Sequence, residues 1–253
     1  MKILALESSA TACSVALCED EALVAQSYQN NGLTHSRTLM PMAEDLLKNC
    51  GLTLEDVALI AVAAGPGSFT GLRIGVAAAK GLAWPGDKPC AGVSTLEAMA
   101  WCAAHMGGEI CAVMDARRSQ VYNARFRCVG GRPERLCPDR AVGLDELAAE
   151  LKMSGKPQIL VGDGTALCYN TLTKLGLDVR PAPPHLQFQS AWGVARAALE
   201  QAGAGRLTDA AGLAPEYHRL SQAERERLEK NKKGESDHEY GKSAQSRSPS
   251  AAA

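Results

Sequence analysis

The chain has 253 residues, of which 46% are apolar and 22% are charged, and its formal net charge is −1. This composition suffices for a sizeable hydrophobic core spread over one or two domains. No stretch reaches the roughly 18 apolar residues of a membrane-spanning helix, and the opening Met1–Glu7 is too short and too soon charged for a secretory signal. We therefore expect a cytoplasmic protein that does not enter a membrane.

The nine cysteines agree with a reducing compartment, because their number is odd and no C-x-x-C pair occurs. Most of them lie in apolar runs, where a reduced thiol acts as a small hydrophobic side chain. Neither a disulfide framework nor a zinc finger is indicated.

Charge is distributed unevenly along the chain. Residues 1–100 carry six Lys or Arg and ten Asp or Glu, which gives 6 − 10 = −4. A protein that binds nucleic acid by itself needs a basic surface that neutralises phosphates. Residues 1–100 therefore predict no such surface.

The first half of the chain predicts an α/β unit that starts with an antiparallel meander. Its expected elements are strands at 2–8, 12–18 and 21–29, a helix at 36–50, a strand at 57–64, a helix at 70–84, a strand at 90–93 and a helix at 94–105.

The second half begins in the same way and predicts a second α/β unit. Its expected elements are strands at 109–115, 120–128 and 135–142, a helix at 144–151, a strand at 158–161 and helices at 165–175 and 190–201. The pattern indicates a duplicated fold with subdomains 1–105 and 106–220. The remaining residues, 221–253, are charged and poor in apolar side chains, so we expect a disordered tail.

A glycine-rich loop between a buried strand and a helix is the most informative segment. Gly65, Gly67, Ser68 and Thr70 stand where backbone N–H groups favour an anion, so they predict a vestigial phosphate loop. The loop has no Walker-type Lys-Ser/Thr pair, because Lys80 lies ten residues beyond Thr70. It also lacks the G-x-S-x-G pattern of a nucleophile elbow.

Two helices carry more apolar or small surface than one buried face requires. Gly71, Gly75 and Ala79 recur at i, i+4 and i+8, so another helix could approach closely along them. On the helix at 36–50 the spacing aligns Leu39, Met42 and Leu46, while Met40 and Leu47 lie on other sides. These faces predict an intermolecular helix bundle, and the alternative is packing against the chain's own sheet.

Several motifs together resemble the TsaB family, also called YeaZ, over about residues 1–220. The most specific string is Gly65-Pro66-Gly67-Ser68-Phe69-Thr70-Gly71-Leu72-Arg73-Ile74-Gly75. It is accompanied by Ile3-Leu4-Ala5-Leu6-Glu7-Ser8-Ser9, His35-Ser36, Val93-Ser94-Thr95-Leu96-Glu97-Ala98, Asp115-Ala116-Arg117 and Leu213-Ala214-Pro215-Glu216-Tyr217.

The resemblance implies an actin-like ATPase (RNase H-like) fold with two tandem α/β subdomains and mixed sheets. It implies a non-catalytic scaffold subunit of the complex that forms N6-threonylcarbamoyladenosine next to the anticodon of tRNAs. TsaD would bind through the helices at 36–50 and 70–84, TsaE would join the larger complex, and the same surface would form a homodimer when the chain is alone. We assign this interface to His35, Leu39, Met42, Leu46, Gly71 and Gly75.

The resemblance also implies no catalytic residue, no metal and no cofactor of the chain's own, and leaves open ATP or ADP at the junction with TsaD. Metal-binding relatives space His residues on a helix, whereas here His35 is followed by Leu39 four residues on. Actin-like kinases carry Asp near the metal-nucleotide, where this chain has Glu7. The alternatives are an actin-like enzyme, either a kinase or ATPase or a glycoprotease-like peptidase, and a dimeric binding module with another partner.

Overall fold

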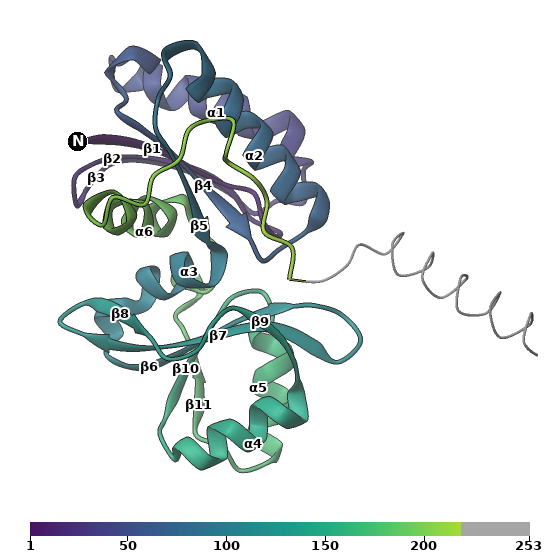
Figure 1. Ribbon diagram of the computed structural model, residues 1–253. Coiled ribbons are helices and arrows are strands. Elements are labelled where there is room, and N and C mark those ends of the chain that lie inside the picture. Colours follow the sequence, from purple (N-terminus) through teal and green to yellow (C-terminus); the bar gives the residue numbers. More distant parts are fainter. Residues whose placement is uncertain (219–253) are drawn as a thin grey trace, which may run out of the picture. The chain divides into compact units, whose positions relative to one another are not determined.

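Two mixed β-sheets with the same strand order organise the chain, whose computed structural model describes residues 1–218 (Figure 1). The first sheet has the order β3-β2-β1-β4-β5. Its strands are β1 (Lys2–Glu7), β2 (Cys13–Glu19), β3 (Ala22–Gln29), β4 (Leu59–Gly65) and β5 (Cys90–Ser94). The first three strands pair antiparallel, and β4 and β5 run parallel to the central β1.

The second sheet repeats this arrangement around a central β6, in the order β11-β10-β6-β7-β8 with β9 also paired to β7. Its strands are β6 (Gly108–Asp115), β7 (Gln120–Val129), β8 (Arg132–Arg135), β9 (Arg140–Gly143), β10 (Gln158–Val161) and β11 (Val179–Pro181). The expected duplicated α/β fold of the actin-like class is confirmed. The single strand expected at 135–142 is wrong, because Leu136–Asp139 separates β8 from β9, and the short β11 was not expected.

Six α-helices of the described part cover these sheets. Helices α1 (His35–Asn49) and α2 (Phe69–Ala83) pack on one face of the first sheet, and α4 (Leu144–Ser154) and α5 (Thr165–Lys174) pack on the second. Short 3₁₀ helices lie at Leu54–Asp56, Trp84–Gly86, Ala104–Met106 and Pro184–Leu186. None of the helices within residues 1–218 combines the length and apolarity that a membrane span requires.

Each of the remaining two helices packs against the sheet of the other half. Helix α3 (Thr95–Ala103) follows the first sheet, yet Leu96, Met99 and Ala100 pack into the core of the second. Helix α6 (Ala191–Gly203) follows the second sheet and packs into the first (Figure 1). The two helices also contact each other. Helix α6 thus completes the first half, whereas α3 contacts both cores, because its Ala98 and Trp101 belong to the first.

The expected assignment of all of 106–220 to the second subdomain is wrong at its end. Beyond α6, Thr208 pairs with Cys90, Leu213 joins the first core, and the N–H of Glu216 donates to the Ala64 carbonyl at 2.8 Å. The apolar spacing of a helix shows that one side is buried but does not show which sheet covers it. The predicted tail 221–253 lies outside the described residues.

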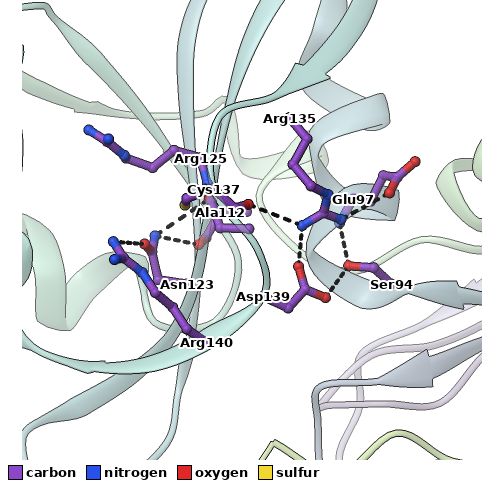
Figure 2. Close-up of polar contacts among 10 residues, drawn as sticks. Ser94, Glu97, Ala112, Asn123, Arg125, Arg135, Cys137, Asp139 and Arg140 are labelled. Carbon is purple, nitrogen blue, oxygen red and sulfur yellow. Dashed lines mark hydrogen bonds and ion pairs between the residues drawn. The ribbon is translucent and has the colours of Figure 1, made fainter.

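A polar cluster fastens the start of α3 to the segment after β8 (Figure 2). The Ser94 hydroxyl caps α3 by accepting from the N–H of Glu97 at 3.1 Å, and it donates to Asp139 at 2.5 Å. Arg135 pairs with Glu97 at 2.9 Å and with Asp139. Because Ser94 ends a strand of the first sheet, these contacts link the two halves.

Candidate functional site

Helix α2 begins in a corner built from the β1–β2 turn and the glycine-rich loop. The N–H of Ser68 donates to the Ser9 carbonyl at 2.6 Å, and the Ser8 hydroxyl donates to the Gly71 carbonyl at 2.9 Å. A Cβ on Gly67 would lie 2.5 Å from the Ser9 oxygen, and one on Gly71 would lie 2.1 Å from the Ser8 oxygen. Close packing of two backbones therefore requires these glycines.

The end of the described chain closes the same corner from the other side. Gly65 has φ +149°, and a Cβ there would lie 2.2 Å from the Glu216 carbonyl oxygen. The rings of Phe69 and Tyr217 stack with centroids 4.3 Å apart. Of the predicted phosphate loop, Gly65 and Gly67 face the chain's own backbone, while Ser68 and Thr70 are exposed. Phosphate binding there stays a prediction.

Two carboxyl groups lie at strand ends in different sheets, Glu7 at the end of β1 and Asp163 shortly after β10. Burial raises the pKa of Glu7 to about 7, against hydrogen bonds from Ser9 that lower it, and Asp163 raises it further. Burial also raises the pKa of Asp163, although a hydrogen bond from Gln189 at 3.1 Å opposes this. The Glu7 Oε2 atom is buried and has no partner among the described residues.

No group of three or more His, Cys, Asp or Glu side chains within residues 1–218 is placed to hold a metal ion. His35 lies at the start of α1, where its Nε2 is 2.6 Å from the Ala10 carbonyl oxygen. It therefore ties α1 to the β1–β2 turn.

The predicted interface residues do not form an outer surface. Leu39, Met42 and Leu46 are at most 5% exposed and belong to the core of the first sheet. A Cβ on Gly75 would lie 2.5 Å from the Ser8 hydroxyl and 3.1 Å from Val62. Assigning these positions and Gly71 to a partner surface is therefore wrong, because the residue spacing that aligns a helix face does not tell the core side from the solvent side.

The opposite sides of the same two helices are open to solvent. On α1 the outer residues include Met40, which is 42% exposed, and Pro41. On α2 they are Arg73, Ala77 and Gly81, which follow one another at i, i+4 and i+8. Nothing lies within 4 Å of a Cβ built on Gly81. Small residues at this spacing leave the α2 backbone accessible to another helix.

Trp84, directly after α2, adds a large apolar side chain that is 67% exposed. We call Met40, Arg73, Ala77, Gly81 and Trp84 the outer α1–α2 face. These residues were not predicted as a set, because the sequence alone does not show that Ala77, Gly81 and Trp84 are exposed. The signal that it does contain is the spacing of two small residues four apart, Ala77 and Gly81.

Comparisons with known proteins identify the family. A family model described as "TsaD: tRNA N6-adenosine threonylcarbamoyltransferase" matches residues 30–226. A Bacillus subtilis protein, "tRNA threonylcarbamoyladenosine biosynthesis protein TsaB", is 34% identical over 241 residues, which cover 92% of this chain and 100% of the relative. The chain belongs to the TsaB (YeaZ) family. The resemblance expected from the sequence motifs is thus confirmed.

Other TsaB relatives agree with this placement. Escherichia coli TsaB is 40% identical over 129 residues, covering 50% of this chain and 55% of the relative. The solved structure of YeaZ from Pseudomonas aeruginosa has a TM-score of 0.75 and 26% identity, and covers 85% of this chain and 99% of the other. A second solved structure, described as similar to peptidase YeaZ from the same organism, gives the same TM-score and identity.

Proposed function

We propose that the chain is the non-catalytic scaffold subunit of the complex that forms N6-threonylcarbamoyladenosine in tRNA, and that it works in the cytoplasm. The observation that carries this proposal is the match along the whole length of a TsaB protein from Bacillus subtilis. In this role the chain binds TsaD, and TsaE joins the pair. It meets tRNA only through that complex, in keeping with the net charge of −4 over residues 1–100.

The outer α1–α2 face supports the contact with TsaD. Because the TsaD family model matches residues 30–226 of this chain, the two proteins are related, and a partner of related fold would present an equivalent helix pair. Two such pairs form a bundle when small residues let the backbones approach. A second copy of the chain would offer the same pair, so the face also accounts for a homodimer when TsaD is absent. ATP or ADP at the junction with TsaD belongs to this proposal as well.

The corner of Gly65–Thr70 supports the non-catalytic role. In an actin-like ATPase a loop at this place would approach a nucleotide phosphate. Here the backbones of Ser9 and Glu216 take up the space beside Gly67 and Gly65. The backbones of Ser9 and Glu216 thus occupy space that a bound phosphate would need.

Depletion of the chain from its host tests the proposal. The modified adenosine in bulk tRNA, measured by mass spectrometry, should fall, and the wild-type gene should restore it. Gly81→Arg should fail to restore it, because a long charged side chain would separate the two helix pairs. Gly203→Arg is the matched control, since Gly203 also lies in the last turn of a helix and has nothing within 4 Å of its Cβ position.

Three outcomes would argue against the proposal. Unchanged modification after depletion would exclude the role in this pathway. Full restoration by Gly81→Arg would exclude the outer α1–α2 face. Peptidase, kinase or ATPase activity of the purified chain alone would contradict the non-catalytic assignment.

A further inference from the structure

Three side chains at the start of α2 form a compact cation–aromatic cluster. The Arg73 guanidinium lies over the Phe69 ring, with 4.0 Å between Cζ and the centroid. Its Nε donates to the Tyr217 hydroxyl at 3.1 Å. Tyr217 in turn stacks on Phe69 at 4.3 Å. Two rings and one hydrogen bond thus hold a single arginine in place.

The held guanidinium keeps unused donors. Among the described residues, neither terminal nitrogen of Arg73 has a hydrogen-bond or ion-pair partner. Because Arg73 is also exposed, these donors are accessible to a ligand. An arginine presents its terminal nitrogens as a planar fork that fits a carboxylate with two parallel bonds. Because the cluster already restricts the side chain, binding costs less conformational entropy than it would for a mobile surface arginine.

The position of Arg73 indicates where such a ligand would come from. Arg73, Ala77 and Gly81 share one side of α2, so a helix that docks along the small residues would pass the guanidinium. The adjacent α1 exposes Glu44 and Asp45, and residues 1–100 have a net charge of −4. This environment disfavours the many phosphates of a nucleic acid backbone, whereas the Arg73 guanidinium can neutralise a single carboxylate placed opposite it.

We propose that Arg73 is a binding hot spot that accepts an Asp or Glu side chain of the protein docked on the outer α1–α2 face, and that Tyr217 is its positioning residue. This inference rests on the proposed function, because it takes the docked protein to be TsaD. It assigns a role to the Leu213–Tyr217 motif, whose last residue reaches across the glycine-rich corner to α2. Exposed arginines and aromatic residues held in this way are typical of interface hot spots.

The test is a binding titration of the full chain with purified TsaD from the same organism, at low and high salt. Arg73→Ala should weaken binding about 10- to 100-fold, and binding by this variant should depend less on salt than that of the wild type. Arg73→Lys keeps the charge but loses the fork, so it should rescue binding only in part. Tyr217→Phe keeps the stacked ring and removes the hydrogen bond, so it should weaken binding less than Arg73→Ala.

Arg180→Ala is the matched control, because Arg180 is an exposed arginine on β11 in the other sheet and should leave binding unchanged. Circular dichroism should show native folding of every variant. Wild-type affinity in Arg73→Ala would overturn the inference while leaving the proposed function intact. Weakened self-association with full TsaD binding would place a second copy there instead, and loss of tRNA retention by the chain alone would indicate a phosphate ligand. No TsaD binding by the wild type would overturn the proposed function itself.

Discussion

The two halves share a strand order but differ in the helix pair that each presents to solvent. On the first half, α2 exposes Ala77 and Gly81, so the backbone of α2 is accessible along the helix. On the second half, α5 exposes longer side chains such as Leu167, Tyr169 and Lys174, which keep a neighbouring helix away from the backbone. Of the two α/β halves, the first therefore has an outer helix with small exposed residues. That half carries the proposed partner surface.

In both halves, glycines in a loop between a strand and a helix pack closely against the backbone of the central strand or the turn that follows it. After β4, Gly67 and Gly71 lie against the backbone of the β1–β2 turn. After β10, a Cβ on Gly162 would lie 2.0 Å from the Val113 oxygen, and one on Gly164 would lie 3.1 Å from Met114. The glycines in both loops thus allow a helix to start against the central strand. A glycine-rich string between strand and helix need not report a ligand.

Gly75→Arg is expected to reduce stability the most, because it places a large side chain on the buried side of α2. The new side chain would start 2.5 Å from the Ser8 hydroxyl and 3.1 Å from Val62, in space that these side chains already fill. Overpacking and the burial of a charge together cost several kcal/mol, on the order of the whole stability of a domain. We expect an insoluble or unfolded protein by circular dichroism. A well-folded Gly75→Arg would show instead that this side of α2 faces outward.

Gly81→Arg is the matched change on the outer side of the same helix. The Cβ position is open, and an arginine at a helical glycine improves helix propensity by roughly 0.5–1 kcal/mol. The thermal midpoint should therefore stay equal or rise by a few degrees, while partner binding is lost. A lower midpoint than that of the wild type would mean that Gly81 packs within the chain.

The order of the helices and strands could be predicted from the sequence, because hydrophobic spacing and turn residues are local signals. The meander of β1, β2 and β3 and the helices α1 and α2 were each expected within a few residues of their bounds. The sequence did not show which side of each helix faces the sheet. Both sides of α2 have small residues four apart, Gly71 and Gly75 on one side and Ala77 and Gly81 on the other. Only the position of β1 and β4 shows which side is inside.

Long-range packing was the second kind of information that local patterns lacked. The apolar spacing of α6 predicts one buried side, yet that side packs on the first sheet and not on the second. The contact between Tyr217 and Phe69 joins residues far apart in sequence, so no spacing rule points to it. The proposed hot spot at Arg73 depends on that contact and therefore became visible only in the structure.

The carboxyl groups at the ends of β1 and β6 allow a second test of how the halves differ. Glu7 is fully buried, whereas Asp115 is exposed and accepts a hydrogen bond from the Arg117 N–H at 2.6 Å. Burial raises the pKa of Glu7 from 4.5 to about 7, so the folded state binds a proton more tightly than the unfolded state. Stability from this group is complete below pH 4.5 and is lost as pH rises toward 7.

We therefore expect Glu7→Gln to remove a pH-dependent loss on the order of 3 kcal/mol in the free energy of unfolding. Urea denaturation at pH 5 and pH 8 measures it. The variant should resemble the wild type at pH 5 and be more stable at pH 8, whereas Asp115→Asn should show no such gain. Equal pH slopes in Glu7→Gln and wild type would mean that Glu7 stays ionised in the folded protein.

The smallest effect is expected where the two halves meet in solvent. Arg132, in the β7–β8 hairpin of the second sheet, pairs with Glu21 of the first half at 3.5 Å and with Glu200 of α6 at 3.2 Å. Arg132 is 59% exposed and Glu21 is 64% exposed, so water and salt screen the attraction. Arg132→Ala should lower the free energy of unfolding by less than about 1 kcal/mol, and the loss should shrink further in 1 M salt. Urea denaturation at low and high salt measures both quantities. The shared helices α3 and α6, rather than these surface charges, would then hold the halves together. A loss of several kcal/mol that salt does not reduce would assign that role to the hairpin instead.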